Sequence, residues 1–415
     1  MAETDGKLGP IPAETKMMFA AGLSIFVVTA VIGILNGLDV VTFSRAWVVT
    51  HVHAGTLGWI TLAMMGAAIW MFAQRFDPDD EALSSETVGD LRVRGLAIFS
   101  IVAIALYVAA FASGITWLRP IVGLLTIVAS VLFLLWMIRR ARLVGLDVAR
   151  LGMIMTVTFL ILGGLLGILL GLAMAEKFGL TTERFAGSHP ASMVAGFLVL
   201  GGATLAEWLL EPEGRRIADS RAGVVQVILL FVAGTFLALG ELLKVQALLM
   251  LNLPCLIAGI VIVLVRLRKH FRGMRWLEAT AGRHIGLALA FLVVNVGLVV
   301  YAIALYAEDF SKVPTWLIFA LDHLQFVGVV TNVLLATLLI AMARTTAGRP
   351  LVDHIAFWFM NAGMVGFVIG IMLDSAPLKR IFAPVMGLAI LVAVGANLIR
   401  MREATQVADT AVTDG

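Results

Sequence analysis

Two stretches of this sequence match one another without a gap: HVHAGTLGWITLAMMGAAIW, residues 51–70, and HPASMVAGFLVLGGATLAEW, residues 189–208. Both begin with histidine, carry a glycine seven residues later (Gly58 and Gly196) with an aromatic residue directly after it, and end in tryptophan. Each is apolar over about 20 residues, the length that a helix needs to cross a bilayer. The match therefore predicts two equivalent membrane-spanning helices.

A third stretch, LDHLQFVGVVTN at residues 321–332, follows the same pattern more loosely. Gly328 comes five residues after His323, as Gly58 comes five residues after His53. Internal similarity of this kind indicates a chain built from repeated units. On this register the corresponding positions are His51/His53, His189/Ala191 and Leu321/His323.

The composition supports a membrane protein. Of the 415 residues, 61% are hydrophobic and 14% charged, against about a quarter charged in soluble domains. The single cysteine excludes a disulfide framework, thiolate zinc sites and iron–sulfur clusters, so any metal must be bound by histidine or oxygen. The net charge of +3 does not indicate nucleic-acid binding, because the basic residues fall mainly in short loops on one side.

Twelve apolar stretches are long enough to span a bilayer, which predicts an all-α membrane protein with twelve transmembrane helices. The connections between them are under 20 residues long, so residues 1–415 form a single membrane domain, with short tails at 1–16 and 400–415. The spans are expected at approximately 17–38, 47–74, 94–114, 116–138, 152–175, 187–210, 222–243, 245–267, 284–306, 314–342, 352–373 and 379–399.

The distribution of positive charge predicts the orientation. If the N-terminus is cytoplasmic, 22 of the 30 lysines and arginines lie on the cytoplasmic side, as the positive-inside rule requires. The first residues, MAETDGKLGPIPAETK, lack the basic region and cleavage site of a secretory signal. We therefore expect a multi-pass protein of the inner (plasma) membrane, with the lipid bilayer as its environment and both termini in the cytoplasm.

Histidines occupy matched positions in the second, sixth and tenth expected helices. These helices are four apart, so all three enter from the non-cytoplasmic side, and a rise of about 1.5 Å per residue puts their imidazoles within about 5–15 Å of that surface. Ionisable groups in a membrane commonly face a cavity or a cofactor, although hydrogen bonding between helices is the alternative. By contrast, we expect His270, His284 and His354, at the cytoplasmic ends of helices or in a loop, to be solvated or interfacial.

Neutral imidazole is a good ligand for heme iron and for copper. His51 and His53 are two residues apart, about 200° around a helix, and so cannot both point at the same object. One of the two is expected to bind the metal, while the other supports that ligand or belongs to a second site.

Twelve helices in three groups of four, with histidines near the outer ends of the second, sixth and tenth, resemble the heme–copper oxidase subunit I superfamily. HVHAGTLGWITLAMMG and HLQFVGVVTNVLLATLLIAMARTTAGRPL also resemble NnrS-type heme proteins of nitric oxide response. The resemblance implies a pseudo-threefold bundle that binds heme b near the outer surface, with a redox partner or accessory subunit. Lys379 and Arg380 fall where oxidases place a basic pair against the heme propionates; ordinary outer-loop cations are the alternative.

The departures from the oxidase pattern narrow the function. Residues 222–243 contain neither the histidines of the copper site nor a tyrosine, and Leu321 replaces the first of two histidines in the tenth helix. What remains is the pair of histidines that would bind the low-spin heme. One of them is His323, and the other is His53 on the repeat register or, otherwise, His51. His51 and His189 could form a minimal copper or second-heme site, although two ligands hold copper weakly. The resemblance thus implies electron transfer or nitric-oxide-related heme chemistry rather than dioxygen reduction, and leaves open whether the protein is an oxidoreductase.

Other features have structural alternatives. Gly163, Gly167 and Gly171 recur every four residues and predict close helix packing. The acids Asp322 and Glu207 could orient a ligand or carry protons, or could be structural. A polytopic transporter without heme is the rival function, because polar residues within helices and repeated units are also typical of transporters.

Overall fold

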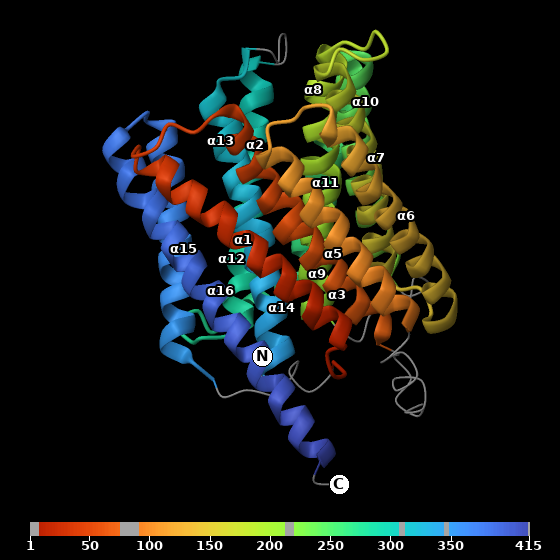
Figure 1. The fold of residues 1–415 in the computed structure, drawn as a ribbon, viewed down its shortest axis with the longest axis vertical. Coiled ribbons are helices and arrows are strands. Elements are labelled where there is room, and N and C mark those ends of the chain that lie inside the picture. Colours follow the sequence, from red (N-terminus) through yellow and green to blue (C-terminus); the bar gives the residue numbers. More distant parts are fainter. Residues whose placement is uncertain (1–7, 75–90, 212–219, 307–311, 344–347, 414–415) are drawn as a thin grey trace.

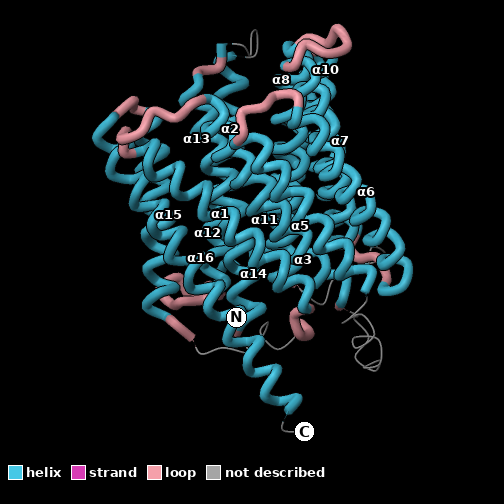
Figure 2. The backbone as a smooth tube through the Cα atoms, viewed as in Figure 1, coloured by secondary structure: helices cyan, strands magenta, loops and turns pink. Residues whose placement is uncertain are grey.

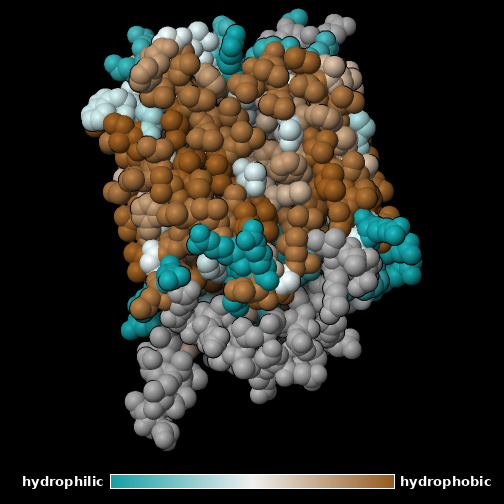
Figure 3. Space-filling model, turned by 90° about the vertical axis from the view of Figure 1, so that its right-hand side faces the viewer, coloured by the Kyte–Doolittle hydropathy of each residue, from teal (hydrophilic) through white to brown (hydrophobic). Residues whose placement is uncertain are grey.

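The computed structural model describes residues 8–74, 91–211, 220–306, 312–343 and 348–413, and within these ranges the chain is a bundle of long helices joined by short loops (Figures 1 and 2). Twelve helices in these ranges are long and apolar enough to cross a membrane. On the face shown in Figure 3, a broad apolar band lies between more hydrophilic residues at the two ends. The prediction of an all-helical, multi-pass membrane protein is confirmed.

Most spans in the described ranges are single helices. They are α1 (Ala13–Gly37), α5 (Leu91–Ala112), α6 (Leu118–Val144), α7 (Val148–Met174), α10 (Arg221–Leu243), α11 (Gln246–Arg272), α12 (Ala281–Tyr306), α15 (Pro350–Met372) and α16 (Ala376–Thr413).

The second, sixth and tenth spans are composite, because a π-helical segment separates two α-helical ones. We call them span 2, span 6 and span 10. Span 2 is α2 (Arg45–His53), η1 (Ala54–Thr61) and α3 (Leu62–Ala73); span 6 is α8 (Thr182–Ala191), η2 (Ser192–Leu198) and α9 (Val199–Leu210); span 10 is α13 (Thr315–His323), η5 (Leu324–Thr331) and α14 (Asn332–Met342).

The composite spans form the centre of the bundle. In their most apolar stretches, 94%, 89% and 83% of the residues are buried inside the protein, against 33–50% in the other spans described. A peripheral helix turns one face to lipid and so buries only part of its surface, whereas a central helix is covered on all sides. Side chains of spans 2, 6 and 10 are therefore placed to meet one another.

The π segments begin at the same place relative to the histidines. Counted from the first π residue, His51 and His189 lie three positions earlier, while His53 and His323 lie one position earlier. A π-helix is rare, and π segments are frequently found at functional sites. The positions matched in the sequence are therefore also matched in backbone conformation.

Two helix ends differ from the expected tails. Helix α1 begins at Ala13 and α16 continues to Thr413, so parts of both tails, 1–16 and 400–415, are helical. Arg400, expected at the start of the tail, is 3% exposed and donates to both carboxylate oxygens of Asp353 at 2.7 Å. The helix continues because no glycine or proline interrupts residues 400–413. Residues 1–7 and 414–415 lie outside the described ranges.

The two ends of the bundle differ in the groups they carry. The composite spans begin at the upper end in Figure 1, which we call the histidine end, and finish at the lower end, which we call the basic end. The described chain ends both lie at the basic end (Figure 1). The basic end also holds the buried arginines Arg150, Arg283 and Arg400.

Candidate functional site

His51 and His189 are each fixed by the helix packed beside them. His51 Nδ1 lies 2.9 Å from the carbonyl oxygen of Thr29 on α1, and His189 Nδ1 lies 2.7 Å from the carbonyl oxygen of Gly163 on α7. Because a backbone carbonyl only accepts, Nδ1 must carry the proton in both rings. The Nε2 atom of each ring therefore keeps its lone pair.

His53 and His323 are anchored within their own helices. His53 Nδ1 donates to the carbonyl of Val49 at 2.9 Å, and His323 Nδ1 donates to that of Phe319 at 2.7 Å, in both cases four residues earlier. Both rings also meet a phenylalanine of the following span. The His53 ring stacks on Phe111 at 3.8 Å between centroids, and the His323 ring meets Phe367 edge-on at 4.9 Å.

The four imidazoles therefore share one state. Each is half-buried, each has its Nδ1 proton on a backbone carbonyl, and in the described part of the chain no Nε2 has a hydrogen-bond partner. Histidines that bind a metal commonly donate their other ring N–H to a carbonyl or carboxylate in this way. Among the described residues no group of three or more histidine, cysteine or acidic side chains could hold a metal ion, so ligation would come from pairs.

Glycines make room for two of the rings. A β-carbon at Gly33 would lie 3.1 Å from Cε1 of His51, and one at Gly167 would lie 2.9 Å from Cε1 of His189. Each glycine comes four residues after the residue whose carbonyl accepts from that ring, Thr29 or Gly163. The glycine pattern of α7, interpreted from the sequence as helix packing alone, thus also accommodates a histidine. The signal for this role in the sequence was the four-residue spacing of the glycines in α7, the helix that packs against His189.

The structure brings the histidines together in two pairs. The His53 and His189 rings are nearly parallel, at an interplanar angle of 7° and 6.4 Å between centroids. His51 and His323 are close enough to interact electrostatically. Of the two sequence alternatives for the partner of His323, this electrostatic interaction favours His51, and the ring geometry places His189 beside His53.

A second set of contacts occurs once beside each composite span. In each π segment a glycine packs against a side chain of the neighbouring span. A β-carbon on this glycine would lie 2.2 Å from that side chain in span 2, 2.3 Å in span 6 and 3.1 Å in span 10. The glycines matched in the sequence are thus points of close helix approach. The three contacts are Gly58 with Ile25 of α1, Gly196 with Phe159 of α7, and Gly328 with Phe291 of α12.

Four residues further along, each of these neighbouring helices forms a hydrogen bond with the same composite span. Thr29 Oγ1 donates to the carbonyl of His51 at 3.2 Å, and Asn295 Nδ2 donates to the carbonyl of Leu321 at 2.8 Å. Gly163, at the corresponding place on α7, accepts from His189. Leu321 thus occupies in span 10 the place that a histidine occupies in spans 2 and 6.

The other charged residues singled out in the sequence at the histidine end, Lys379, Arg380 and Asp322, are exposed or half-buried. Lys379 Nζ pairs with Asp374 at 3.0 Å, and Arg380 with Asp39 at 2.7 Å, both at the surface of the histidine end. Asp322 is half-buried beside His323 and has no hydrogen bond to another described residue. The role of the Lys379–Arg380 pair toward a heme propionate stays a prediction.

The expectation that His284 is solvated or interfacial is wrong. His284 is 2% exposed, and its Nδ1 lies 2.8 Å from Oδ1 of Asn332, whose amide donates to Asn361 at 2.7 Å. Its ring meets Phe357 edge-on at 4.7 Å. The hydrogen bond to Asn332 compensates for the loss of contact with water on burial. The position of His284 near a helix end in the sequence did not reveal this partner. His354 is half-buried beside Arg283.

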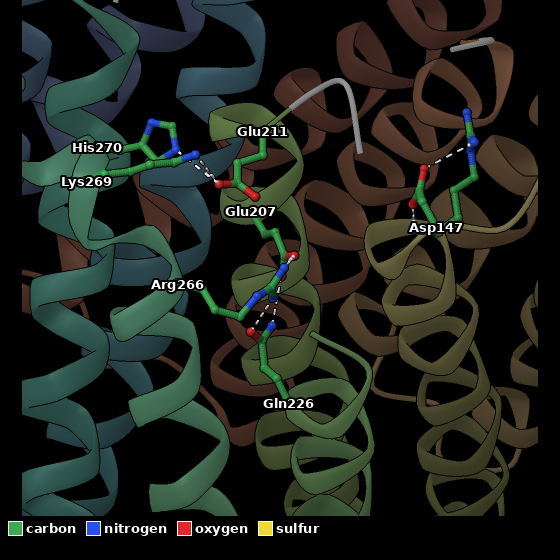
Figure 4. A network of polar contacts seen from close by, with 8 residues as sticks. Asp147, Glu207, Glu211, Gln226, Arg266, Lys269 and His270 are labelled. Atoms are coloured by element: carbon green, nitrogen blue, oxygen red, sulfur yellow. Dashed lines mark hydrogen bonds and ion pairs between the residues drawn. The ribbon is translucent and has the colours of Figure 1, made fainter. Parts of the chain in front are cut away.

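Glu207 belongs to a closed polar cluster at the basic end (Figure 4). Arg266 donates to Glu207 at 2.5 Å and to Gln226 at 2.7 Å, while Gln226 donates back to Glu207 at 2.9 Å. Both charged side chains are 6% exposed. The carboxylate is satisfied by protein groups, which favours the structural interpretation of Glu207. Nearby, Glu211 pairs with Lys269 at 2.9 Å.

Comparison with known proteins adds no assignment: no protein-family model matches this chain, and a search among curated proteins gives no significant match.

Proposed function

We propose that the protein binds a b-type heme between His51 and His323, near the histidine end, and that it works in electron transfer or nitric-oxide-related heme chemistry. The anchored imidazoles carry this proposal. A proton held on Nδ1 by a carbonyl leaves Nε2 as the metal-binding atom. Spans 2 and 10 each carry one such ring, and the two rings are close enough to interact electrostatically.

The donor set fits heme better than a bare copper ion. Copper and zinc sites commonly use three or more protein ligands, and no such group occurs among the described residues. A heme needs only two axial ligands, because its own nitrogens supply the rest. A pair of imidazoles without carboxylates or thiolates matches that requirement. Copper remains the minor alternative predicted from the sequence.

The proposal includes an arrangement of three four-helix repeats around spans 2, 6 and 10, on an oxidase subunit I-like plan. The glycine contacts that recur beside these spans support it, as do the three π segments. On this plan the histidine end faces away from the cytoplasm and the basic end faces the cytoplasm, in accordance with the positive-inside rule. A redox partner or accessory subunit is part of the same proposal.

When bound, the heme supplies one-electron chemistry. The chain holds each axial imidazole in one tautomer and one orientation: Thr29 and Gly33 position His51, while Phe319 and Phe367 position His323. Ligation from both sides leaves no open position, which suits electron transfer, or gas binding that displaces one imidazole. Helix α10 has no histidine for a copper site, so dioxygen reduction is not proposed.

The test is a reduced-minus-oxidised optical spectrum of the detergent-purified protein from heme-replete cells. We expect low-spin b-type bands that weaken in His51→Ala and in His323→Ala. Leu321→Ala is the matched control, because Leu321 lies at the same level of span 10 and is not a ligand; its spectrum should equal that of the parent. A parent that is intact by size exclusion but lacks a Soret band would overturn the proposal and leave transport or structural packing as the role of the histidines.

A further inference from the structure

The heme between His51 and His323 leaves the second histidine pair unexplained. His53 and His189 come from spans 2 and 6, and their parallel rings are 6.4 Å apart between centroids. Two imidazoles bound to opposite faces of one metal have centroids about 6 Å apart, because the distance from each nitrogen to its ring centroid is added to two metal–nitrogen bonds of about 2 Å. The observed separation matches that of two such ligands, and parallel ring planes are compatible with this arrangement.

The second pair is built like the first. In each pair one ring is held by a carbonyl of the neighbouring helix and lies against a glycine four residues further on; these are His51 and His189. In each pair the other ring is held by a carbonyl of its own helix and contacts a phenylalanine of the next span; these are His323 and His53. Equivalent surroundings predict equivalent chemistry.

An arginine beside the second pair points to an anionic ligand. Arg119, at the start of α6, is 8% exposed, and its Nε has no hydrogen-bond partner. Its guanidinium lies over the Phe111 ring, 5.0 Å from the centroid, and Phe111 in turn stacks on His53. Within the described chain no carboxylate pairs with Arg119. A buried cation without a counter-charge is costly, so this arrangement favours a ligand that supplies a carboxylate.

We propose that His53 and His189 are the axial ligands of a second heme, and that Arg119 binds one of its propionates. This inference rests on the proposed function, because it assigns the same class of cofactor to a second site. Metal-binding imidazoles and an adjacent unpaired cation together fit a metalloporphyrin, which carries both a metal and carboxylates. The third interface, between spans 6 and 10, has Ala191 and Leu321 at the corresponding positions and therefore takes none.

The test is the number of hemes per chain, measured as the pyridine hemochrome on protein of known concentration, with copper measured by mass spectrometry on the same samples. We expect two hemes in the parent and one in His53→Ala, His189→Ala, His51→Ala and His323→Ala. The double variant His51→Ala/His189→Ala should bind none. Leu321→Ala is the control and should keep two.

Two further variants separate ligation from folding. His189→Met replaces one axial ligand by another that heme iron accepts, so it should retain two hemes and raise the midpoint potential of one. Arg119→Gln should lower the retention of one heme during purification, while Arg119→Lys restores it.

The outcomes are distinct. One heme in the parent, lost in His51→Ala and His323→Ala but kept in His53→Ala and His189→Ala, would overturn the second site and leave the proposed function intact. One heme with one copper, the copper being lost in His53→Ala and His189→Ala, would also overturn it in favour of a copper site. No heme in the intact parent would overturn both proposals.

Discussion

The two ends of this bundle treat their buried polar groups differently. At the basic end, Arg266, Glu207 and Gln226 satisfy one another, and Arg150 bonds to Asp147 and to backbone carbonyls of neighbouring segments. At the histidine end, four imidazoles each use one nitrogen and leave the other without a partner among the described residues.

This difference separates structural from ligand-binding groups. A buried polar group that its neighbours satisfy needs nothing from outside the chain, whereas one that stays unsatisfied is costly unless a ligand completes it. The charged groups Arg266, Glu207 and Arg150 at the basic end are thus paired within the chain, whereas the histidine end has four Nε2 atoms that are available to a ligand. Four predictions test this distinction.

Arg266→Met should have the largest effect on stability, because it leaves Glu207 as a buried carboxylate without its cation. Loss of one partner of a buried pair costs about 3–5 kcal/mol in free energy of unfolding. Thermal unfolding of the purified protein, followed by size exclusion, measures the change. Lys269→Met is the control, since Lys269 is 59% exposed and its pair contributes about 1 kcal/mol or less. Equal effects for both variants would remove the distinction between a buried and an exposed ion pair.

Gly167→Val should displace the His189 ring, because even a β-carbon at that position would lie 2.9 Å from Cε1. We expect loss of one heme per chain and a destabilisation of about 1–3 kcal/mol from overpacking. Gly33→Val is the matched variant, which should remove the other heme by displacing His51. Hemochrome assay of both, together with the double variant, checks that the losses add. Full heme content in either single variant contradicts the role assigned to that glycine.

Thr331→Val removes the acceptor for the indole of Trp59, which donates from η1 to η5 at 3.1 Å. An unsatisfied buried N–H costs about 1–3 kcal/mol, and the heme content should stay unchanged because no imidazole is involved. Thr337→Val is the control on the same span. Its hydroxyl donates only to the carbonyl of Val333 within its own helix, so its loss should cost less. A larger effect for Thr337→Val would indicate that the contact between η1 and η5 contributes little.

Arg380→Gln should have the smallest effect. The side chain is 55% exposed and pairs with Asp39, which is 71% exposed, and pairs of this kind contribute about 1 kcal/mol or less. Heme retention in this variant should exceed that of Arg119→Gln, where the substituted arginine is buried and has no counter-charge. Heme loss on dilution compares the two. Faster loss from Arg380→Gln would favour the oxidase-like role of Lys379 and Arg380 over that of Arg119.

Several features could be predicted from the sequence. The twelve spans follow from apolar segments of bilayer length, and the register of spans 2, 6 and 10 follows from the glycines and histidines they share. The recurring glycines have a physical reason, because Gly58 and Gly196 each lie where another helix approaches too closely for a β-carbon. Such contacts restrict residue type and so leave a pattern in the sequence.

Other features could not be predicted. His284 lies near a helix end in the sequence, yet it is buried against Asn332, a residue 48 positions away. The burial of Arg400 in α16 is accompanied by its pairing with Asp353 of α15, a residue 47 positions away. The burial of Arg119 against Phe111 could not be read from the sequence, because this contact forms only when α5 and α6 pack together.

The sequence by itself determined that this chain spans a membrane twelve times and places histidines at matched levels of three helices, because hydrophobic length and residue spacing are local properties. Only the tertiary structure decided which histidines are neighbours: the His53 ring lies beside the His189 ring, and His51 is close enough to His323 to interact with it electrostatically. The physical reason is rotational. Two histidines two residues apart face different directions, and which neighbour each one meets depends on how the central helices are turned and packed.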